Sequence, residues 1–295
     1  MADLKLVPPV PRGVGRMPRG ETREHFAKLA RPLVRTIAVT SGKGGVGKST
    51  VAANLAVALG SLGARVVLFD GDLAQANLDL LLGLSPRWDL GHVLRGEKTL
   101  DQIVVEGPHG VRLVPAASGD RDLADLDDFR REGLYRELSR LSADADLVLV
   151  DTASGASHLT SSFARAASEL IVVTTPEPTS YSDAYGLLKV LVAQGLTTTP
   201  GVLVNRAPSL EEAEEVAHDL ASLTRRFLSM NVNALGSLPD DPAVGQSVRR
   251  RRTVVEAAPK CPAALAFVAL AGRLWARPSD PSPRAQLPER QRLSA

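Results

Sequence analysis

Residues 41–50 read SGKGGVGKST and combine four glycines with two lysines and hydroxyl side chains. They fit the pattern G-x-x-x-x-G-K-[ST], in which glycines let successive backbone N–H groups face a phosphate. An apolar run precedes the segment and a helical pattern follows it, so a helix N-terminus would lie behind the phosphate. The segment therefore predicts a loop that binds the phosphates of a nucleoside triphosphate. An ordinary glycine-rich turn is the alternative, but such a turn does not need the Lys-Ser pair.

Individual residues of this loop have expected roles. Lys48 would reach the β- and γ-phosphates, the Ser49 hydroxyl would bind Mg²⁺, and Thr50 would donate to the α-phosphate. Lys48 is therefore a candidate catalytic residue and Ser49 a candidate metal ligand. The nucleotide-binding residues expected in the loop are Gly42, Gly44, Gly45, Val46, Gly47, Lys48, Ser49 and Thr50.

Carboxylates follow two further apolar runs. Asp70 and Asp72 follow the first, and two carboxylates one residue apart can serve Mg²⁺ and an attacking water together. Asp151 ends the second, which is the arrangement of a Walker B site, whose aspartate holds Mg²⁺ through water. Gly155 would bring a backbone N–H close to the γ-phosphate. The alternatives are a structural turn at Asp70 and a helix N-cap at Asp151.

Lys43 distinguishes this loop from an ordinary phosphate-binding loop. The whole chain has seven lysines, and two of them lie here. The sequence K-G-G-V-G-K-[ST] resembles the deviant Walker A motif of the MinD/ParA ATPases, in which the first lysine crosses a dimer interface to the partner's nucleotide. The resemblance implies an ATP-dependent homodimer that parts when ATP is hydrolysed to ADP and phosphate. It also implies a catalytic role for Lys43, a place in the Mg²⁺ shell for Asp70, and for Asp72 the orientation of the attacking water.

The same family places an Asn-Arg pair and a Pro-Asp turn around the adenine. Asn205 and Arg206 end one apolar run, and Pro239 and Asp240 follow a later one. The resemblance therefore implies that these four residues bind the nucleotide and that Asn205 hydrogen-bonds the edge of the base. As isolated dipeptides they are weak signals, and their order after the loop gives them weight.

Spacer sequences between these motifs are similar to the FlhG/FleN branch of the family. The similar stretches are residues 77–83, 103–108, 151–153 and 176–185. That branch regulates the number and placement of polar flagella, so the resemblance implies a regulatory ATPase of this kind, with ATP and Mg²⁺ as cofactors. The alternatives are a MinD-like ATPase that selects the division site and a ParA-like ATPase that partitions DNA. A P-loop kinase is a third, against which Lys43 argues.

The composition indicates one domain with tails. A chain of 295 residues, 44% of them hydrophobic, can bury one large core. A net charge of +2 is too small to demand nucleic acid as a partner. Cys261 is the single cysteine, which excludes disulfides and cysteine-based iron–sulfur sites within one chain. Because the chain lacks an apolar run of about eighteen residues and an apolar signal core, we expect a cytoplasmic protein, with peripheral attachment to the inner membrane face or a cell pole as a further option.

From residue 34 onward, apolar runs alternate with helical patterns. Runs of Val, Ile and Leu joined by helical crossovers predict an α/β fold, a mostly parallel twisted sheet with helices on both faces in a three-layer sandwich. The predicted strands are residues 36–40, 65–70, 111–115, 146–151, 169–174, 201–205 and 234–238. The predicted helices are residues 51–62, 126–141, 159–167, 179–194 and 210–228. In such a sheet ligands bind beyond the carboxyl ends of the strands, where the motifs described above lie.

Three segments follow from these patterns. Residues 1–33 combine prolines, glycines and basic side chains and predict a flexible basic arm, either a solvated tail or a docking segment for a protein partner. Residues 34–277 are the predicted P-loop ATPase domain, and residues 278–295 a disordered polar tail.

Two segments near the C-terminus are candidates for contact with other molecules. Residues 263–277 predict a helix whose apolar side chains go round most of its surface, which favours burial as the last core helix over peripheral contact with a membrane. The four arginines at positions 249–252 could bind DNA phosphates or acidic lipid, although a solvated helix end is the favoured interpretation. DNA binding is therefore not favoured.

Overall fold

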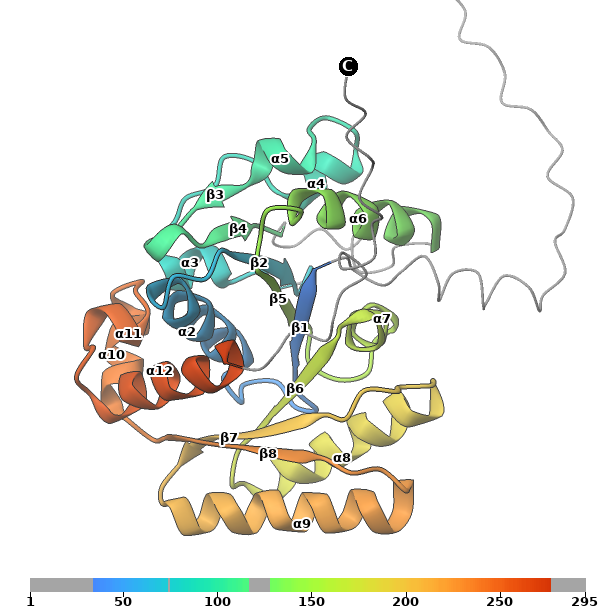
Figure 1. Cartoon of the computed structure of the whole chain (residues 1–295), viewed down its shortest axis with the longest axis vertical. Helices are drawn as coiled ribbons and strands as arrows, with labels where there is room; N and C mark the ends of the chain where they lie inside the picture. Colours follow the sequence, from blue (N-terminus) through green and yellow to red (C-terminus); the bar gives the residue numbers. More distant parts are fainter. Residues whose placement is uncertain (1–33, 74, 117–127, 277–295) are drawn as a thin grey trace, which may run out of the picture.

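The chain folds as a mostly parallel β-sheet with helices on both faces (Figure 1). A computed structural model describes residues 34–73, 75–116 and 128–276, and it describes residues 128–132 by their backbone alone. Within these residues the sheet has eight strands in the order β3-β4-β2-β5-β1-β6-β7-β8. The strands are β1 Arg35–Thr40, β2 Val66–Gly71, β3 Val105–Glu106, β4 Arg112–Val114, β5 Leu147–Thr152, β6 Glu169–Thr174, β7 Gly201–Ala207 and β8 Asn233–Pro239.

The predicted α/β fold is confirmed. Neighbouring strands pair in parallel from β4 to β8, and only β3 pairs antiparallel, with β4, in the described part of the chain. Every predicted strand forms, and β6 has the predicted bounds. β3 has no counterpart among the predicted strands, because two residues are too few to show an alternating pattern.

Alternate side chains of each strand pack into helical layers on opposite faces of the sheet. In β1, Ile37 and Val39 pack with α2 and α12, whereas Ala38 packs with α7 and α8. The first layer contains α2 Lys48–Ser61, α3 Leu78–Leu82, α10 Pro242–Arg249, α11 Val254–Ala257 and α12 Pro262–Trp275. The second contains α4 Leu90–Leu94, α5 Leu100–Ile103, α6 Asp128–Leu141, α7 His158–Ala166, α8 Pro178–Ala193 and α9 Leu210–Leu228.

All five predicted helices before the C-terminal one form, as α2, α6, α7, α8 and α9. α9 has the predicted bounds, and its start is fixed by the Ser209 side chain, which accepts the Glu212 N–H at 3.1 Å. The four- and five-residue helices α3, α4, α5 and α11 and the eight-residue α10 have no predicted counterpart. Segments this short carry too few turns for a helical period to stand out.

α12 completes the core, in agreement with the burial favoured for residues 263–277. Phe267, Leu270 and Leu274 are buried and pack with the layer that contains α2. Leu265 and Trp275 remain exposed. Within the part of the chain that the structure describes, no helix has both the length and the apolar character needed to cross a membrane.

Some predictions fall outside the described residues. These are the basic arm at 1–33, the polar tail at 278–295, and the last residue of the segment 263–277. The domain boundaries drawn at residues 34 and 277 therefore stay predictions.

Candidate functional site

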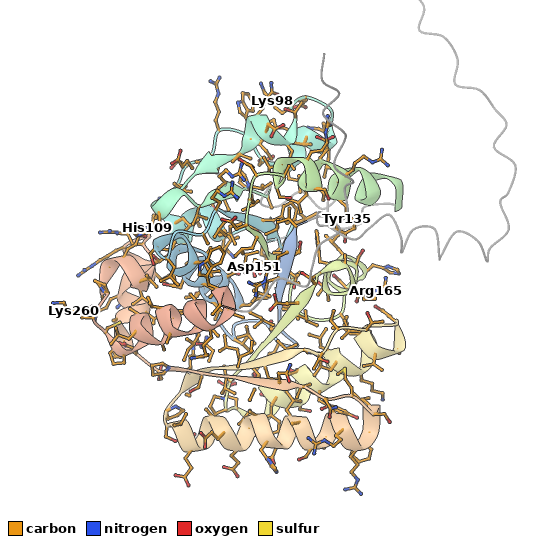
Figure 2. The ribbon with its side chains drawn as sticks, in the orientation of Figure 1. Lys98, His109, Tyr135, Asp151, Arg165 and Lys260 are labelled. Carbon is orange, nitrogen blue, oxygen red and sulfur yellow. The ribbon has the colours of Figure 1, made fainter. Side chains whose placement is uncertain are left out.

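The carboxyl ends of three adjacent strands bring the predicted site residues together. β5 lies between β2 and β1, and Asp151 on β5 is in register with Asp70 on β2 and with Val39 on β1. The predicted phosphate-binding loop follows β1 directly and leads into α2 at Lys48. Asp151 therefore lies near the centre of the molecule, among all three strands (Figure 2).

The loop turns through glycines into the N-terminus of α2. Gly45 and Gly47 have φ angles of 81° and 90°, in the left-handed region that favours glycine. Gly47 is the N-cap of α2, and neither a capping side chain nor an acidic residue satisfies the first turn. The backbone N–H groups of that turn, and the positive end of the helix, are thus available to an anion. This geometry fits the phosphate-binding role predicted for the loop.

Lys48 and Asp151 form a buried ion pair in the middle of the site. The Lys48 Nζ donates to Asp151 Oδ1 at 2.9 Å, and the two side chains are 7% and 1% exposed. Burial raises the pKa of Asp151 above its ordinary value, and the positive charge of Lys48 opposes that rise. The predicted phosphate-binding lysine and the predicted metal ligand therefore compensate each other's charge at this position.

Oxygen atoms around this pair fit a magnesium ion and its nucleotide. Ser49 Oγ lies 3.5 Å from Lys48 Nζ, and Asp72 Oδ2 lies 4.0 Å from it. Hydroxyl and carboxylate oxygens are the ligands that Mg²⁺ takes. At the end of β1, the buried Thr40 Oγ1 has no hydrogen-bond partner among the described residues, which leaves one more polar atom beside the loop.

Asp70 is used to hold the loop that follows β2. Its side chain is buried, and it accepts the N–H groups of Asp72 at 3.2 Å, Asn77 at 3.2 Å and Leu78 at 3.3 Å. Burial and the negative charge of Asp151 raise the pKa of Asp70 well above its ordinary value, against the effect of these three hydrogen bonds. Asp70 thus fixes the backbone that presents Asp72, and its predicted place in the Mg²⁺ shell stays a prediction.

Asp72 lies within reach of the same centre. Its Oδ1 accepts the N–H of Gln75 at 3.1 Å, while Oδ2 faces Lys48. The side chain is 16% exposed, so it is more accessible to water than Asp151. This position fits a carboxylate that orients a water molecule.

Lys43 points away from Lys48 and toward the start of α8. Its Nζ donates to Glu177 Oε2 at 3.0 Å and to Thr179 Oγ1 at 2.9 Å. Sequence reasoning did not identify these two partners, although both belong to the stretch 176–185 that carried the branch resemblance. The predicted role of Lys43 across a dimer interface stays a prediction.

Close packing against backbone atoms requires a glycine at position 42, and a side chain at position 47 would displace the side chain of Asn205. A Cβ on Gly42 would lie 2.1 Å from the Asp183 carbonyl oxygen of α8, and a Cβ on Gly47 would lie 2.4 Å from Asn205 Nδ2. The loop is therefore clamped between α8 and the end of β7. The sequence pattern assigned Gly42 to phosphate binding only, and its contact with α8 is an additional requirement.

The four residues predicted around the adenine lie at the ends of β7 and β8. The Asn205 side chain donates to the Val46 carbonyl oxygen at 2.7 Å, so it holds the predicted phosphate loop. Arg206 is exposed with a φ of 53°. Pro239 is in register with the end of β7, and the Asp240 N–H donates to a β7 carbonyl at 3.0 Å. Their contact with adenine stays a prediction.

Gly155 also contacts the phosphate loop. Its N–H donates to the Ser41 carbonyl oxygen at 2.8 Å, and its φ of 78° needs a glycine. To reach a γ-phosphate, this N–H has to exchange its acceptor. The predicted role of Gly155 as a nucleotide sensor stays a prediction. In that role, its hydrogen bond to Ser41 would break when the N–H turns to the γ-phosphate.

Asn54 is a further connection that the sequence did not reveal. Its amide donates to the Thr50 carbonyl oxygen at 2.8 Å and accepts the N–H groups of Val254 at 2.7 Å and Val255 at 3.3 Å. This buried side chain joins the first turns of α2 to α11. The sequence signal for this contact was Asn54 itself, the polar residue in the apolar run 51–60.

The sequence and the fold both match known proteins. Residues 37–254 match the model of the CobQ/CobB/MinD/ParA nucleotide binding domain. The antiactivator FleN of Pseudomonas aeruginosa is 43% identical over 86% of this chain and 91% of that protein. The flagellum site-determining protein YlxH of Helicobacter pylori is 30% identical over 76% of each. The septum site-determining protein MinD of Pyrococcus horikoshii, solved with Mg-ADP, has a TM-score of 0.67 at 30% identity and covers 82% of this chain and 96% of that one.

The matched range includes the phosphate loop, the carboxylates of β2 and β5, and Asn205. The predicted enzyme class, an ATPase that uses Mg²⁺, is confirmed at the level of the family, together with the predicted branch. The chain therefore belongs to the CobQ/CobB/MinD/ParA nucleotide-binding family, as a P-loop ATPase of its FlhG/FleN-like branch.

Proposed function

We propose that this chain is an ATP-driven switch that regulates the number or placement of polar flagella. ATP holds two copies together as a homodimer, and hydrolysis separates them. The flagellar role rests on one observation, the 43% identity to the antiactivator FleN over 86% of the chain. The name of YlxH, a flagellum site-determining protein, points to the same process.

Nucleotide binding begins at the loop before α2. The N–H groups of the loop and of the first turn of α2 hold the phosphates. Lys48 exchanges Asp151 for the β- and γ-phosphates, and Asp151, through water, and Ser49 would hold Mg²⁺. The charge on the buried Asp151 is compensated before and after the exchange.

Hydrolysis uses the carboxylate that remains accessible. Mg²⁺, when bound, neutralises charge that develops on the phosphate oxygens. Asp72 accepts a hydrogen bond from the attacking water and orients it, while Asp70 accepts the backbone N–H of Asp72 and those of Asn77 and Leu78 after it. The water oxygen bonds to the γ-phosphorus as the bond from that phosphorus to the β–γ bridging oxygen breaks. ADP leaves, and the proton lost by the water ends on the released phosphate.

Lys43 links the nucleotide to dimerisation. Its ion pair with Glu177 is on the surface, where the two side chains are 37% and 64% exposed. Such a pair contributes about 0–1 kcal/mol, so Lys43 can leave Glu177 at little cost. In the dimer, Lys43 contacts the phosphates of the partner's nucleotide.

Size-exclusion chromatography and a cellular assay test this proposal. Purified protein with Mg²⁺ and ATP should elute as a dimer and with ADP as a monomer, and Lys43→Ala should remain a monomer with both while it still binds ATP. Deletion of the gene should change the number or position of flagella seen by electron microscopy, and the wild-type gene but not Lys48→Ala should restore them. An unchanged flagellar pattern would reject the flagellar role, and a monomer with ATP would reject the switch.

A second candidate is the selection of a division site. The fold similarity to the septum site-determining protein MinD favours it. The same deletion strain distinguishes the two functions, because misplaced septa with normal flagella would point to division.

Contacts with other molecules complete the proposal. A protein partner through residues 1–33 is proposed from their basic composition. Membrane contact at 263–277 has few side chains to use, because α12 leaves only Leu265 and Trp275 as exposed large apolar residues among those described. Sedimentation with anionic liposomes, with and without ATP, tests that contact.

A further inference from the structure

Helix α9 lies at the border of the molecule (Figure 1), and its first three turns carry an acidic face. Five carboxylates lie there, and all are exposed. Among the described residues, none of them is in an ion pair. The acidic face of α9 consists of Glu211, Glu212, Glu214, Glu215 and Asp219.

Stabilisation of the α9 N-terminus explains only part of the negative charge on this face. Glu211 and Glu212 lie in the first turn, where the positive end of the helix favours carboxylates. Glu215 and Asp219 continue a line from Glu211 at intervals of four residues, and like charges at that spacing destabilise a helix. Leu210, at the start of the face, is 65% exposed, more than any other large hydrophobic side chain in the described residues. The face therefore combines uncompensated negative charge with an exposed apolar residue.

The chain itself contains a segment of opposite charge. Residues 1–33 carry seven basic and three acidic side chains. They also contain apolar residues, such as Phe26 and Leu29, that could cover Leu210. The basic residues are Lys5, Arg12, Arg16, Arg19, Arg23, Lys28 and Arg31.

The length of this segment allows it to reach α9. It joins the described chain at Val34, before β1, and a strand of six residues such as β1 spans about 20 Å. α9 begins just after β7, at the carboxyl end of the sheet. Arg23 and Arg12 precede Val34 by eleven and twenty-two residues, so an extended chain carries them up to about 36 Å and about 73 Å from it.

We propose that the basic N-terminal arm, chiefly its residues 12–23, docks on the acidic face of α9 of the same chain. The arginines pair with carboxylates that have no other cation among the described residues, and the covalent tether supplies a high effective concentration for contacts that are individually weak. Because α9 begins next to Asn205 and Arg206, the docked arm lies beside the nucleotide site. Docking also withholds the arm from other partners until it is released.

Limited proteolysis of the full chain with trypsin tests this docking. We compare the rate of cleavage after Arg16 and Arg19 in the wild type with that in Glu214→Gln/Glu215→Gln, which leaves the first turn of α9 intact. At low salt the variant should be cleaved about threefold faster or more, because two charge partners of the arm are lost. At about 1 M salt, where screening acts within about 3 Å, the rates should converge.

A matched variant controls for net charge. Asp101→Asn/Glu106→Gln removes two exposed carboxylates from α5 and β3, away from α9. It should be cleaved like the wild type at every salt concentration. Equal rates for the wild type and Glu214→Gln/Glu215→Gln at low salt would overturn the proposal, as would equal acceleration in the control.

A carbodiimide cross-link identifies the occupant of the face directly. Arg19→Lys introduces an amine that the reagent can join to a carboxylate in contact with it. Mass spectrometry should find position 19 joined to Glu214 or Glu215 in protein of monomer mass. A bond to α9 that occurs only in covalent dimers would assign the face to a second copy, and a bond only to carboxylates outside α9 would also contradict intramolecular docking there.

Discussion

Lys48 and Lys43 belong to one loop but are held in opposite ways. Lys48 is 7% exposed and pairs with Asp151, which is 1% exposed, whereas Lys43 is 37% exposed and pairs with Glu177, which is 64% exposed. Removing one partner of a buried pair leaves an uncompensated charge, while an exposed pair contributes little. Burial therefore keeps the ammonium group of Lys48 inside the site, whereas the ammonium group of Lys43 lies at the surface, where it can leave Glu177 at little cost.

The two ends of the loop backbone also contact different elements of the fold. The Lys43 end of the loop packs on α8 through Gly42, and the Lys48 end is held by Asn205 of β7. A small displacement of α8 would therefore move the backbone at Lys43 more than the backbone at Lys48. One short loop therefore carries a buried lysine that pairs with a strand carboxylate and an exposed lysine that pairs with a carboxylate at the N-terminus of a helix.

Lys48→Ala should have the largest effect, because it breaks the buried ion pair with Asp151 and removes the predicted phosphate-binding lysine. The variant should lose ATP binding in titration calorimetry. Its free energy of unfolding should fall by about 3–5 kcal/mol, since Asp151 is left buried without its partner. Chemical denaturation measures that loss.

A double variant separates binding from stability. Lys48→Met/Asp151→Asn removes both charges, so it should recover most of the stability lost in Lys48→Ala and still fail to bind ATP. If Lys48→Ala is as stable as the wild type, the buried pair does not carry the charge compensation described here.

Asp72→Ala should abolish turnover while sparing binding. Loss of a group that orients the attacking water should lower the rate of ATP hydrolysis by about 10²-fold or more. The dimer should then persist with ATP in size-exclusion chromatography, whereas the wild type returns to monomer as ATP is consumed. A monomer peak with bound ATP would contradict this role for Asp72.

The buried carboxylates of β2 and β5 predict that the stability of the protein depends on pH. The pKa of Asp70 is raised well above its ordinary value of 3.8, by burial and by Asp151. From pH 3.8 up to that raised pKa, the folded state binds more protons than the unfolded state, so this group makes the free energy of unfolding decrease as pH rises.

Asp70→Asn tests this sign. The variant should show a flatter dependence of unfolding free energy on pH in that range, and at low pH it should be less stable than the wild type, because one amide hydrogen bond to the loop is replaced by a donor–donor contact. A slope unchanged by Asp70→Asn would show that the group does not titrate in this way.

The centre of the site was predictable from the sequence, for a physical reason. The glycine-lysine-serine spacing defines a phosphate loop, and a parallel sheet brings the carboxyl ends of neighbouring strands together. The convergence of Lys48, Ser49, Asp72 and Asp151 follows from those two rules. Neither rule depends on how individual side chains pack.

What the sequence could not predict depends on tertiary packing. The contact of Gly42 with α8 and the hydrogen bond from Asn205 to Val46 require the positions of elements far apart in the chain. The bonds from Asp70 to the loop before α3 require the path of that loop. Short elements such as β3 and α4 were missed because they are too brief for hydrophobic periodicity.

Glu177→Gln should have the smallest effect, and it tests the exposed ion pair between Lys43 and Glu177. The exposed pair contributes about 0–1 kcal/mol, so the free energy of unfolding should change by less than about 1 kcal/mol, and the change should shrink with added salt. ATP binding should be unaffected, and the ATP-dependent dimer should form at least as readily, because Lys43 no longer has to leave a carboxylate. Lys43→Ala is the matched variant: it removes the same ion pair from the other side, yet it should prevent the dimer. If both variants lose the dimer equally, the ion pair itself supports dimerisation and Lys43 does not exchange partners.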